Sequence, residues 1–521
     1  MSRRFGVVIL VAVVALAGCS SISVPEASPT EVTPAPTPTT GPTPATPSPS
    51  ATPAPSTTTS VMVDTRSDPS ADRLGWESGY WYNETVTVTR DDGLNDSELD
   101  AVVARSMARV EQIRNLEFNQ HVPVEVISRE TFKNRTLSRN DDLTSAQRLH
   151  QNVKFEALFM LGENESAIAQ REQNTAANVL GYYSPSNDSI VIVSQNTDSP
   201  QLNEITLSQE LFHAVQEHTF NVSNYTANTL ELHNARDGII EGDGNFVDYL
   251  YEQRCQEGWD CLMPQDHGGG GGGSGVDTHV GMLALRLQPY SDGPVFVQGI
   301  YEARGWSGVN QVYQQPPKST EQTIHPDRYL EDPPTDVTIQ DQSSSRWYVP
   351  DLGKGTIDYA AFGEAGLYVM LWYPSYVESQ QSGARTTVVI PVTHFFNPRS
   401  ASDLDLYNYS HPATAGWDGD RLLPYVTNRS AGTNETGYVW KIVWDSERDA
   451  MQFQEAYRAL LEYHGAEPVQ GRRSTYRIRS GPFADAFYVG TRANQTLIVN
   501  APTVEALAAV RAGAAPRTPG S

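Results

Sequence analysis

The side chains whose types and spacing could support catalysis lie close together, in the segment from residue 205 to residue 218. Gln209 and Glu210 are followed, after two residues, by His213. A zinc peptidase helix carries His-Glu-x-x-His because residues four apart share one helix face. Two imidazoles then bind one metal, and the glutamate activates the metal-bound water as a general base. Glu210 and His213 fit this pattern, whereas Gln209 stands where the first histidine is expected.

A third candidate ligand follows 28 residues after His213, in the segment Glu241-Gly-Asp-Gly. The carboxylate of Glu241 suits the third position of a His-His-Glu site, and the two glycines would let neighbouring helices approach. His218 cannot replace the missing histidine, because a residue five positions after His213 points to another face of the helix. His213 and Glu241 are therefore the two predicted metal ligands.

Two helices must hold these side chains. Apolar spacing predicts helices from Ile205 to Phe220 and from Glu231 to Gln253, after a hairpin over residues 180–194. Further helices are predicted over 95–117 and 292–315, with a short strand over 122–129. From about residue 412 a strand, a helix ending at Gly465, three more strands and a last helix predict a separate small unit. The fold class expected is α+β, with one domain over 62–411 and a C-terminal α+β domain over 412–515.

The first residues predict an exported protein. Arg3 and Arg4 precede an apolar run that is too short to span a membrane comfortably, and the run ends in Leu-Ala-Gly-Cys19. This ending matches a lipobox, which predicts a signal peptide over 1–18 and a lipid on Cys19. The paired arginines favour the twin-arginine export route. Residues 19–61 are rich in Pro and Thr and indicate an extended stalk, so we expect a protein anchored by lipid to the outer face of the cytoplasmic membrane.

Composition supports an extracellular protein of acidic character. Asp and Glu number 62 against 37 Lys and Arg, which gives a net charge of −25. This charge argues against a nucleic-acid partner and is typical of halophilic surfaces. Outside the cell, the two remaining cysteines, Cys255 and Cys261, are expected to form a disulfide. Several Asn-x-Ser/Thr sites make N-glycosylation plausible.

The segments Gln209-Glu-Leu-Phe-His213 and Glu241-Gly-Asp-Gly together resemble the gluzincin fold of metallopeptidases. The segment Gly181-Tyr-Tyr-Ser-Pro resembles the edge strand that lines the substrate cleft of that fold. With its lipobox and stalk, the chain is most similar to a haloarchaeal family of secreted surface lipoproteins. The resemblance covers about residues 70–515. It implies a zincin-like core in which His213 and Glu241 bind zinc and Glu210 is the base.

Gln209 bears on whether this core is active. An amide oxygen is a poor zinc ligand beside imidazole, so the substitution favours a core without a cofactor and with a non-catalytic binding or envelope role. An extracellular protein or peptide would then be the partner. The alternative is a zinc-dependent peptidase that uses Glu210, His213 and Glu241. A third explanation is an unrelated amphipathic helix with an incidental Glu-x-x-His.

In two further segments, polar residues could have either a chemical role or a purely structural one. His325, in Ile-His-Pro, could polarise a substrate carbonyl as a catalytic residue, or it could cap a loop. Asp418 and Asp420 lie in Gly-Trp-Asp-Gly-Asp-Arg421, which could bind calcium but lacks the ligand spacing of an EF-hand. An aspartate–arginine turn is the expected structure there.

Overall fold

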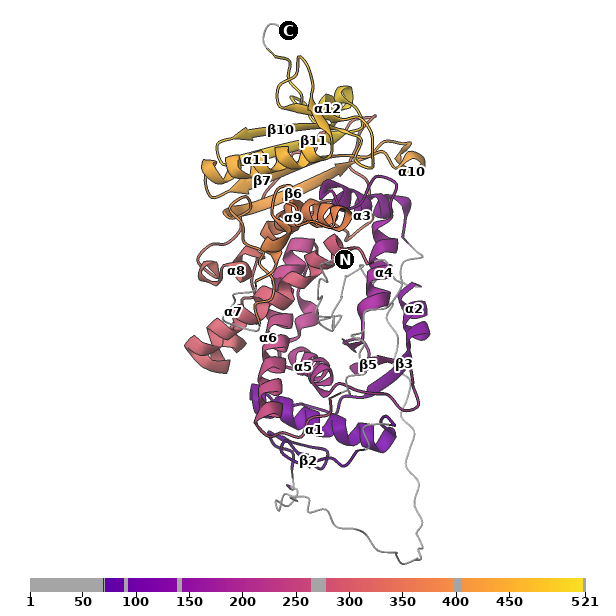
Figure 1. Ribbon diagram of the computed structural model, residues 1–521, viewed down its shortest axis with the longest axis vertical. Helices are drawn as coiled ribbons and strands as arrows, with labels where there is room; N and C mark the ends of the chain where they lie inside the picture. The colour runs from indigo at the N-terminus through magenta and orange to yellow at the C-terminus, as the bar shows by residue number, and fades with distance from the viewer. Residues whose placement is uncertain are drawn as a thin grey trace, which may run out of the picture.

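A computed structural model describes residues 69, 71–88, 92–137, 143–263, 278–397 and 404–518. The predicted signal peptide, Cys19 and the stalk lie outside these residues. The chain is a mixed α+β protein, as the sequence predicts. Figure 1 shows a sheet at one end of an elongated molecule, α1 at the other end, and the long helices α6 and α7 between them.

The N-terminal half contains short strands and long helices. Its elements are β1 (Trp76–Glu77), β2 (Tyr80–Trp81), α1 (Asp96–Arg114), β3 (Val124–Ser128), α2 (Arg129–Leu137), α3 (Ser145–Ala157), α4 (Ala167–Asn178), β4 (Gly181–Ser184), β5 (Ser189–Ser194), α5 (Glu204–Phe220), η2 (Val222–Asn224) and α6 (Leu230–Glu257). Strands β3 and β5 pair in parallel, and β4 forms the antiparallel edge of this three-stranded sheet.

The C-terminal half ends in a larger sheet. Its elements are α7 (Val280–Val312), α8 (Glu321–Ile324), η3 (Pro326–Arg328), α9 (Gly363–Ser382), η4 (Val392–Phe395), β6 (Trp417–Tyr425), α10 (Ser430–Thr433), β7 (Gly437–Trp444), α11 (Glu447–Tyr463), β8 (Ala466–Pro468), β9 (Thr475–Ile478), β10 (Ala486–Arg492), β11 (Gln495–Ala501) and α12 (Val504–Val510). The six strands are antiparallel, in the order β6-β7-β11-β10-β9-β8.

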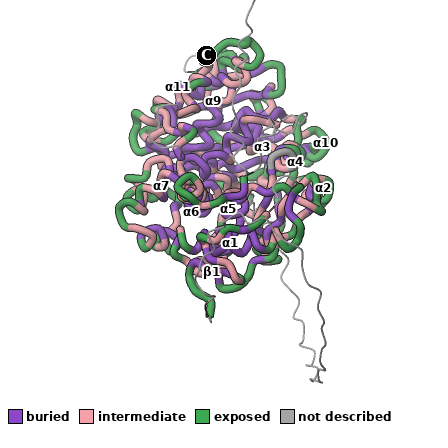
Figure 2. Tube along the Cα trace, turned by 60° about the horizontal axis from the view of Figure 1, so that its bottom comes forward, coloured by how far each residue is buried: buried purple, intermediate pink, exposed green. Residues whose placement is uncertain are grey.

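The two faces of the larger sheet are covered by different helices. Alternate residues of β7 point to opposite faces, so Trp440 packs with α9 and α11 while Val439 packs with α12. The core under α9 also includes Phe155 of α3 and Leu285 of α7. Figure 2 shows buried residues continuing through the middle of the molecule. The hydrophobic core is therefore shared across residue 412, where the sequence suggests a domain boundary.

Three predicted elements differ from the structure. Helix α7 begins at Val280 rather than near residue 292, and it accommodates Pro289 and Pro294 in its interior. Helix α1 begins at Asp96 and ends at Arg114 rather than at residue 117, and Asn95 caps it, because the Asn95 side chain accepts a hydrogen bond from the Glu98 amide. The expected turn at residues 416–421 is wrong, because most of that segment belongs to strand β6.

Candidate functional site

The structure brings the predicted site residues of α5 and α6 together. His213 Nε2 lies 3.5 Å from Glu241 Oε2, and each side chain is about 1% exposed. Gln209 and Glu210, from the same helix as His213, are buried as well. A β-carbon added at Gly244 would lie 3.3 Å from the His213 ring and 3.7 Å from Gln209 Cγ. The residue types that could bind a metal therefore converge on one buried point.

The two glycines of the Glu241-Gly-Asp-Gly segment let three helices meet there. Gly242 faces Gly293 of α7, and a β-carbon at Gly242 would approach the Gly293 backbone to 2.5 Å. Gly244 faces His213 and Gln209 of α5, the second helix that packs against α6 at this point. Any larger residue at Gly242 would separate α6 from α7, since real β-carbons do not approach backbone atoms this closely. The glycines thus position Glu241 beside His213.

Hydrogen bonds fix the ring of His213. The Gln216 amide nitrogen donates to Ile240 O at 2.8 Å and to Tyr313 Oη at 2.7 Å, so Gln216 Oε1 is the acceptor side of that amide. Oε1 lies 2.7 Å from His213 Nδ1, which must therefore carry a proton. His213 Nε2 is left to face Glu241. An imidazole that binds a metal through Nε2 has this arrangement.

A buried ion pair holds Tyr313 and Gln216 in place. Tyr313 donates to Asp243 Oδ2 at 2.7 Å, and Arg114 binds the same carboxylate through Nε and Nη2 at 2.9–3.1 Å. Arg114 and Asp243 are both fully buried. The chain of contacts from Arg114 to His213 includes four residues that sequence analysis did not single out. Gln216 lies three residues after His213 on the same helix face, and Asp243 lies within the glycine segment, so both had a sequence signal.

Glu210 connects α5 to the edge strand β4. Its Oε2 accepts a hydrogen bond of 2.9 Å from the Tyr183 amide, and Gly181 packs against the same side chain. The amide of Tyr183 points away from β5, toward the free edge of the sheet. The segment expected to form an edge strand beside the site does so.

Four buried polar atoms at this point have no hydrogen-bond partner among the described residues. They are Gln209 Nε2, Glu210 Oε1, His213 Nε2 and Glu241 Oε2. Of these atoms, His213 Nε2 and Glu241 Oε2 face each other as an ion pair at 3.5 Å. Gln209 Nε2 and Glu210 Oε1 remain, and each buried polar atom left unpaired costs about 1–3 kcal/mol, which favours a site that takes up a further polar group. Water, a cation or a ligand group would satisfy them.

The ionisable side chains of the site shift one another's pKa values. Burial raises the pKa of Glu210 to about 7, and the nearby Glu241 carboxylate also raises it, against the opposing effect of His213. Burial alone would lower the pKa of His213, but the Glu241 carboxylate, with Glu210 and Gln216, raises that pKa to about 10. His213, facing the Glu241 carboxylate, is thus protonated near neutral pH. The proton balances the Glu241 charge.

The residues fit a zinc ion incompletely. Two ligands of one tetrahedral zinc lie about 3.3 Å apart, close to the separation of His213 Nε2 and Glu241 Oε2. Among the described residues, no further His, Cys, Asp or Glu places a ligand atom within 4.8 Å of both. The remaining candidate for a third ligand is the buried amide of Gln209. The site therefore has two good ligands and one weak one.

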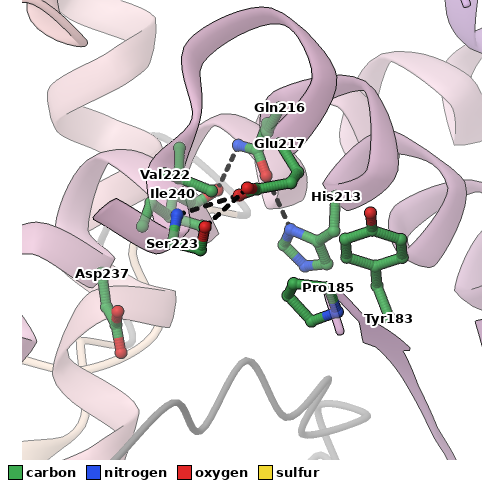
Figure 3. Close-up of a pocket in the computed structure, with 9 residues that line it drawn as sticks. All are labelled: Tyr183, Pro185, His213, Gln216, Glu217, Val222, Ser223, Asp237 and Ile240. Carbon is green, nitrogen blue, oxygen red and sulfur yellow. Dashed lines mark hydrogen bonds between the residues drawn. The ribbon is translucent and has the colours of Figure 1, made fainter. Parts of the chain in front are cut away.

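A small pocket opens beside His213. It has a volume of about 30 Å³, enough room for one or two water molecules. Figure 3 shows Tyr183 and Pro185 next to the His213 ring, with Asp237 of α6 across the pocket. Burial raises the pKa of Asp237 well above its usual range, and the Glu241 carboxylate adds to the effect.

Other predicted residues lie elsewhere. His325 pairs with buried Glu364, with Nε2 3.0 Å from Oε2, and is not among the residues around His213. His218 contacts Asp188 at 2.7 Å, on another helix face as expected. Asp420 is buried and accepts hydrogen bonds from the backbone amides of Phe362 and Gly363, where α9 begins, and from two tryptophans. Asp420 therefore fixes β6 to the start of α9.

The structure also contains a group of carboxylates that the sequence did not suggest. Glu321, Asp332 and Asp445 bring oxygens within 4.8 Å of one another, the one such group among the described residues that could hold a metal. Arg328 Nη1, however, contacts all three, at 2.5, 2.9 and 2.8 Å. The guanidinium supplies the positive charge that the carboxylates need.

The Cys255 and Cys261 sulfurs are bonded in a disulfide at the end of α6. Among the described helices, none combines the length and the apolar character that crossing a bilayer requires.

Comparison with known proteins gives one match. A family model described as a domain of unknown function (DUF8575) matches residues 350–511, which contain α9 and all six strands of the C-terminal sheet. Comparison with curated proteins found no match to the chain, and comparison with solved structures found none either. The matched segment does not include Gln209, His213 or Glu241.

Proposed function

We propose that this chain is a lipid-anchored surface protein whose gluzincin-like core binds an extracellular protein or peptide without cleaving it. The observation that carries the proposal is the convergence of Gln209, His213 and Glu241 at one buried point with unpaired polar atoms. This arrangement is the one expected of a metallopeptidase site that has lost its first histidine. The antiparallel edge strand beside Glu210 supports the same origin.

The missing imidazole argues against catalysis. Zinc binds nitrogen and sulfur ligands better than a neutral amide, and a full set of structural ligands contributes about 10–16 kcal/mol of binding free energy. A site with two strong ligands should hold zinc several kcal/mol less tightly. His213 can instead remain protonated against Glu241, as its raised pKa indicates. The core can then fold and stay ordered without a metal.

The alternative is a zinc peptidase. The buried amide nitrogen of Gln209, which has no hydrogen-bond partner among the described residues, favours it, because Gln209 could turn its oxygen toward a metal bound by His213 and Glu241. Bound zinc would supply a Lewis acid and lower the pKa of a water molecule. Glu210 would then receive the proton, for which its pKa of about 7 is suitable.

Metal content and peptide hydrolysis separate the two functions. The purified protein, measured by plasma mass spectrometry after dialysis against 1 µM zinc, is expected to carry far less than one zinc per chain. It should hydrolyse a fluorogenic casein no faster than the Glu210→Gln variant. One zinc per chain that is lost in His213→Ala, together with hydrolysis that is lost in Glu210→Gln, would establish the peptidase instead.

A further inference from the structure

The sequence contains more Asn-x-Ser/Thr sequons, the acceptor sites of N-linked glycans, than its composition predicts. The chain has 25 Asn residues, and 85 of its 521 residues are Ser or Thr. About one residue in six therefore carries the required hydroxyl, so 25 asparagines placed at random would form about four sequons. Eleven are present. This excess favours a function for some of the sequons, and their surroundings in the structure differ widely.

Two sequons follow each other without a gap in the turn between α5 and α6, as Asn221-Val-Ser-Asn224-Tyr-Thr226. Both asparagines and both hydroxyl residues, Ser223 and Thr226, are exposed. Neither asparagine side chain forms a hydrogen bond with another of the residues that the structure describes. The two carboxamides are therefore exposed and not engaged in holding the fold.

The backbone that carries these two asparagines is fixed to α5. Asn221 ends that helix in the left-handed conformation, with φ 53°, and its N–H donates to Glu217 O at 2.9 Å. Ser223 donates to the Glu217 carboxylate through its amide at 2.9 Å and through its hydroxyl at 2.6 Å. A group bonded to Asn221 or Asn224 is therefore held at a defined place on the surface.

The same turn forms one side of the pocket beside His213. Val222 and Ser223, the two residues between the asparagines, line this pocket (Figure 3). The pocket has room for only one or two water molecules, so a glycan is too large to enter it. Glycans on Asn221 and Asn224 would instead stand at its rim.

Other sequons are closed by their own contacts. Asn494 donates to Trp444 O at 2.7 Å through Nδ2, the atom to which a glycan would be bonded, and the hydroxyl residue of its sequon, Thr496, is fully buried. Asn408 is half-buried, and its side-chain oxygen accepts from the Ser410 amide at 2.9 Å. Asn494 and Asn408 therefore belong to matched sequons that lack an open carboxamide.

We propose that Asn221 and Asn224 each carry an N-linked glycan, and that these glycans keep large molecules away from the rim of the pocket beside His213. The donor is an oligosaccharide bonded through phosphate to a membrane lipid. Asn Nδ2 forms a bond to the first sugar carbon, the bond from that carbon to the phosphate oxygen breaks, and the amide proton leaves with the phosphate. The proposal rests on the surface location proposed above, because the transfer takes place on exported chains.

Glycopeptide mass spectrometry of the protein purified from its native membranes measures the occupancy of each sequon. We expect glycans on Asn221 and Asn224 in most chains, and bare Asn408 and Asn494. Bare Asn221 and Asn224, or equal occupancy of Asn494, would overturn the assignment. If the bare protein has lost its signal peptide, the surface location still stands. If it retains the signal peptide, the surface location is contradicted as well.

A thiol placed between the two asparagines tests the shielding. Val222→Cys keeps both sequons, and its rates are measured with N-ethylmaleimide and with a maleimide carried on a 20-kDa polyethylene glycol. Adding Ser223→Ala and Thr226→Ala removes both sequons and should raise the ratio of the large-reagent rate to the small-reagent rate at least fivefold. Adding Ser223→Thr and Thr226→Ser instead keeps the sequons and should leave the ratio unchanged. Because the ratio cancels changes in the reactivity of the thiol itself, an equal ratio in all three proteins would overturn the shielding.

Discussion

At the scale of single residues, the candidate site depends on groups that never touch a ligand. Arg114 binds Asp243, Asp243 accepts from Tyr313, and these contacts orient Gln216 against His213. An uncompensated buried charge is among the costliest defects in a protein. The ordering of His213 is therefore tied to the stability of the α1–α6 contact.

Replacing Arg114 should show this cost. Arg114→Ala leaves Asp243 buried and unpaired, so we expect the free energy of unfolding to fall by about 3–5 kcal/mol in a urea titration. Arg135→Ala is the matched control, because its pair with Glu125 is 44% and 47% exposed and should be worth less than about 1 kcal/mol. Equal losses in the two variants would show that burial of the Arg114 pair is unimportant.

The buried imidazole of His464 should make stability depend on pH. It stacks on Phe159 with ring centres 4.8 Å apart, and burial lowers its pKa to about 4. Between pH 6.5 and pH 4 the unfolded chain binds a proton that the folded chain does not. Stability from this group is therefore present above pH 6.5 and lost as the pH falls toward 4.

His464→Phe removes that titration and keeps the stacking. Relative to the wild type, the variant should lose about 2–3 kcal/mol less unfolding free energy between pH 7 and pH 4, measured by urea titration at each pH. Parallel pH profiles for the two proteins would mean that His464 is protonated in the folded state as readily as in the unfolded state.

At the scale of elements, close helix contacts decide where the site residues lie. Gly242 of α6 and Gly293 of α7 meet with no room for a β-carbon, whereas nothing lies within 4 Å of a β-carbon at Gly299. Gly242→Ala should therefore destabilise the protein by about 1–3 kcal/mol. Gly299→Ala should raise the melting temperature slightly, because alanine favours a helix by about 1 kcal/mol. The melting temperatures of both variants, measured by thermal unfolding, test these two expectations. A higher melting temperature for Gly242→Ala than for the wild type would refute the close contact.

Much of the site's scaffold could be predicted from sequence, for local reasons. Helices α5 and α6 follow apolar spacing, and the glycines beside Glu241 indicated a close helix approach. Helix α7 was placed too late because Pro289 usually ends a helix, and here tertiary packing overrides that preference. The strand at Asp420 was missed because its pairing with β7 is a non-local contact.

At the scale of the whole molecule, one hydrophobic core connects α7 to the C-terminal sheet. Trp440 of β7 and Leu285 of α7 belong to the same cluster of buried side chains. Asp420 and Glu231 tie the sheet and α6 to the segment around Gly363, where a β-carbon would approach the Glu231 carboxylate to 1.6 Å. Buried side chains on both sides of residue 412 thus pack in one cluster.

The proposed place of this unit is the cell surface, held by lipid on Cys19. If so, the protein should partition into the detergent phase of a Triton X-114 extraction of membranes. Cys19→Ser should leave the protein unprocessed or release it to the aqueous phase, because the stalk is too polar to bind a bilayer. A Cys19→Ser protein that is processed and stays with the membrane as before would rule out the lipid anchor.

The central claim is that Gln209 alone keeps a nearly complete metal site from binding zinc, and a zinc titration of Gln209→His tests it most directly. Isothermal titration of the wild type, Gln209→His, and Gln209→His combined with His213→Ala would give three affinities under one condition. We predict that Gln209→His binds one zinc per chain at least tenfold more tightly than the wild type, a gain of about 1.4 kcal/mol or more, and that His213→Ala abolishes the gain. Equal affinities for the wild type and Gln209→His would contradict the account.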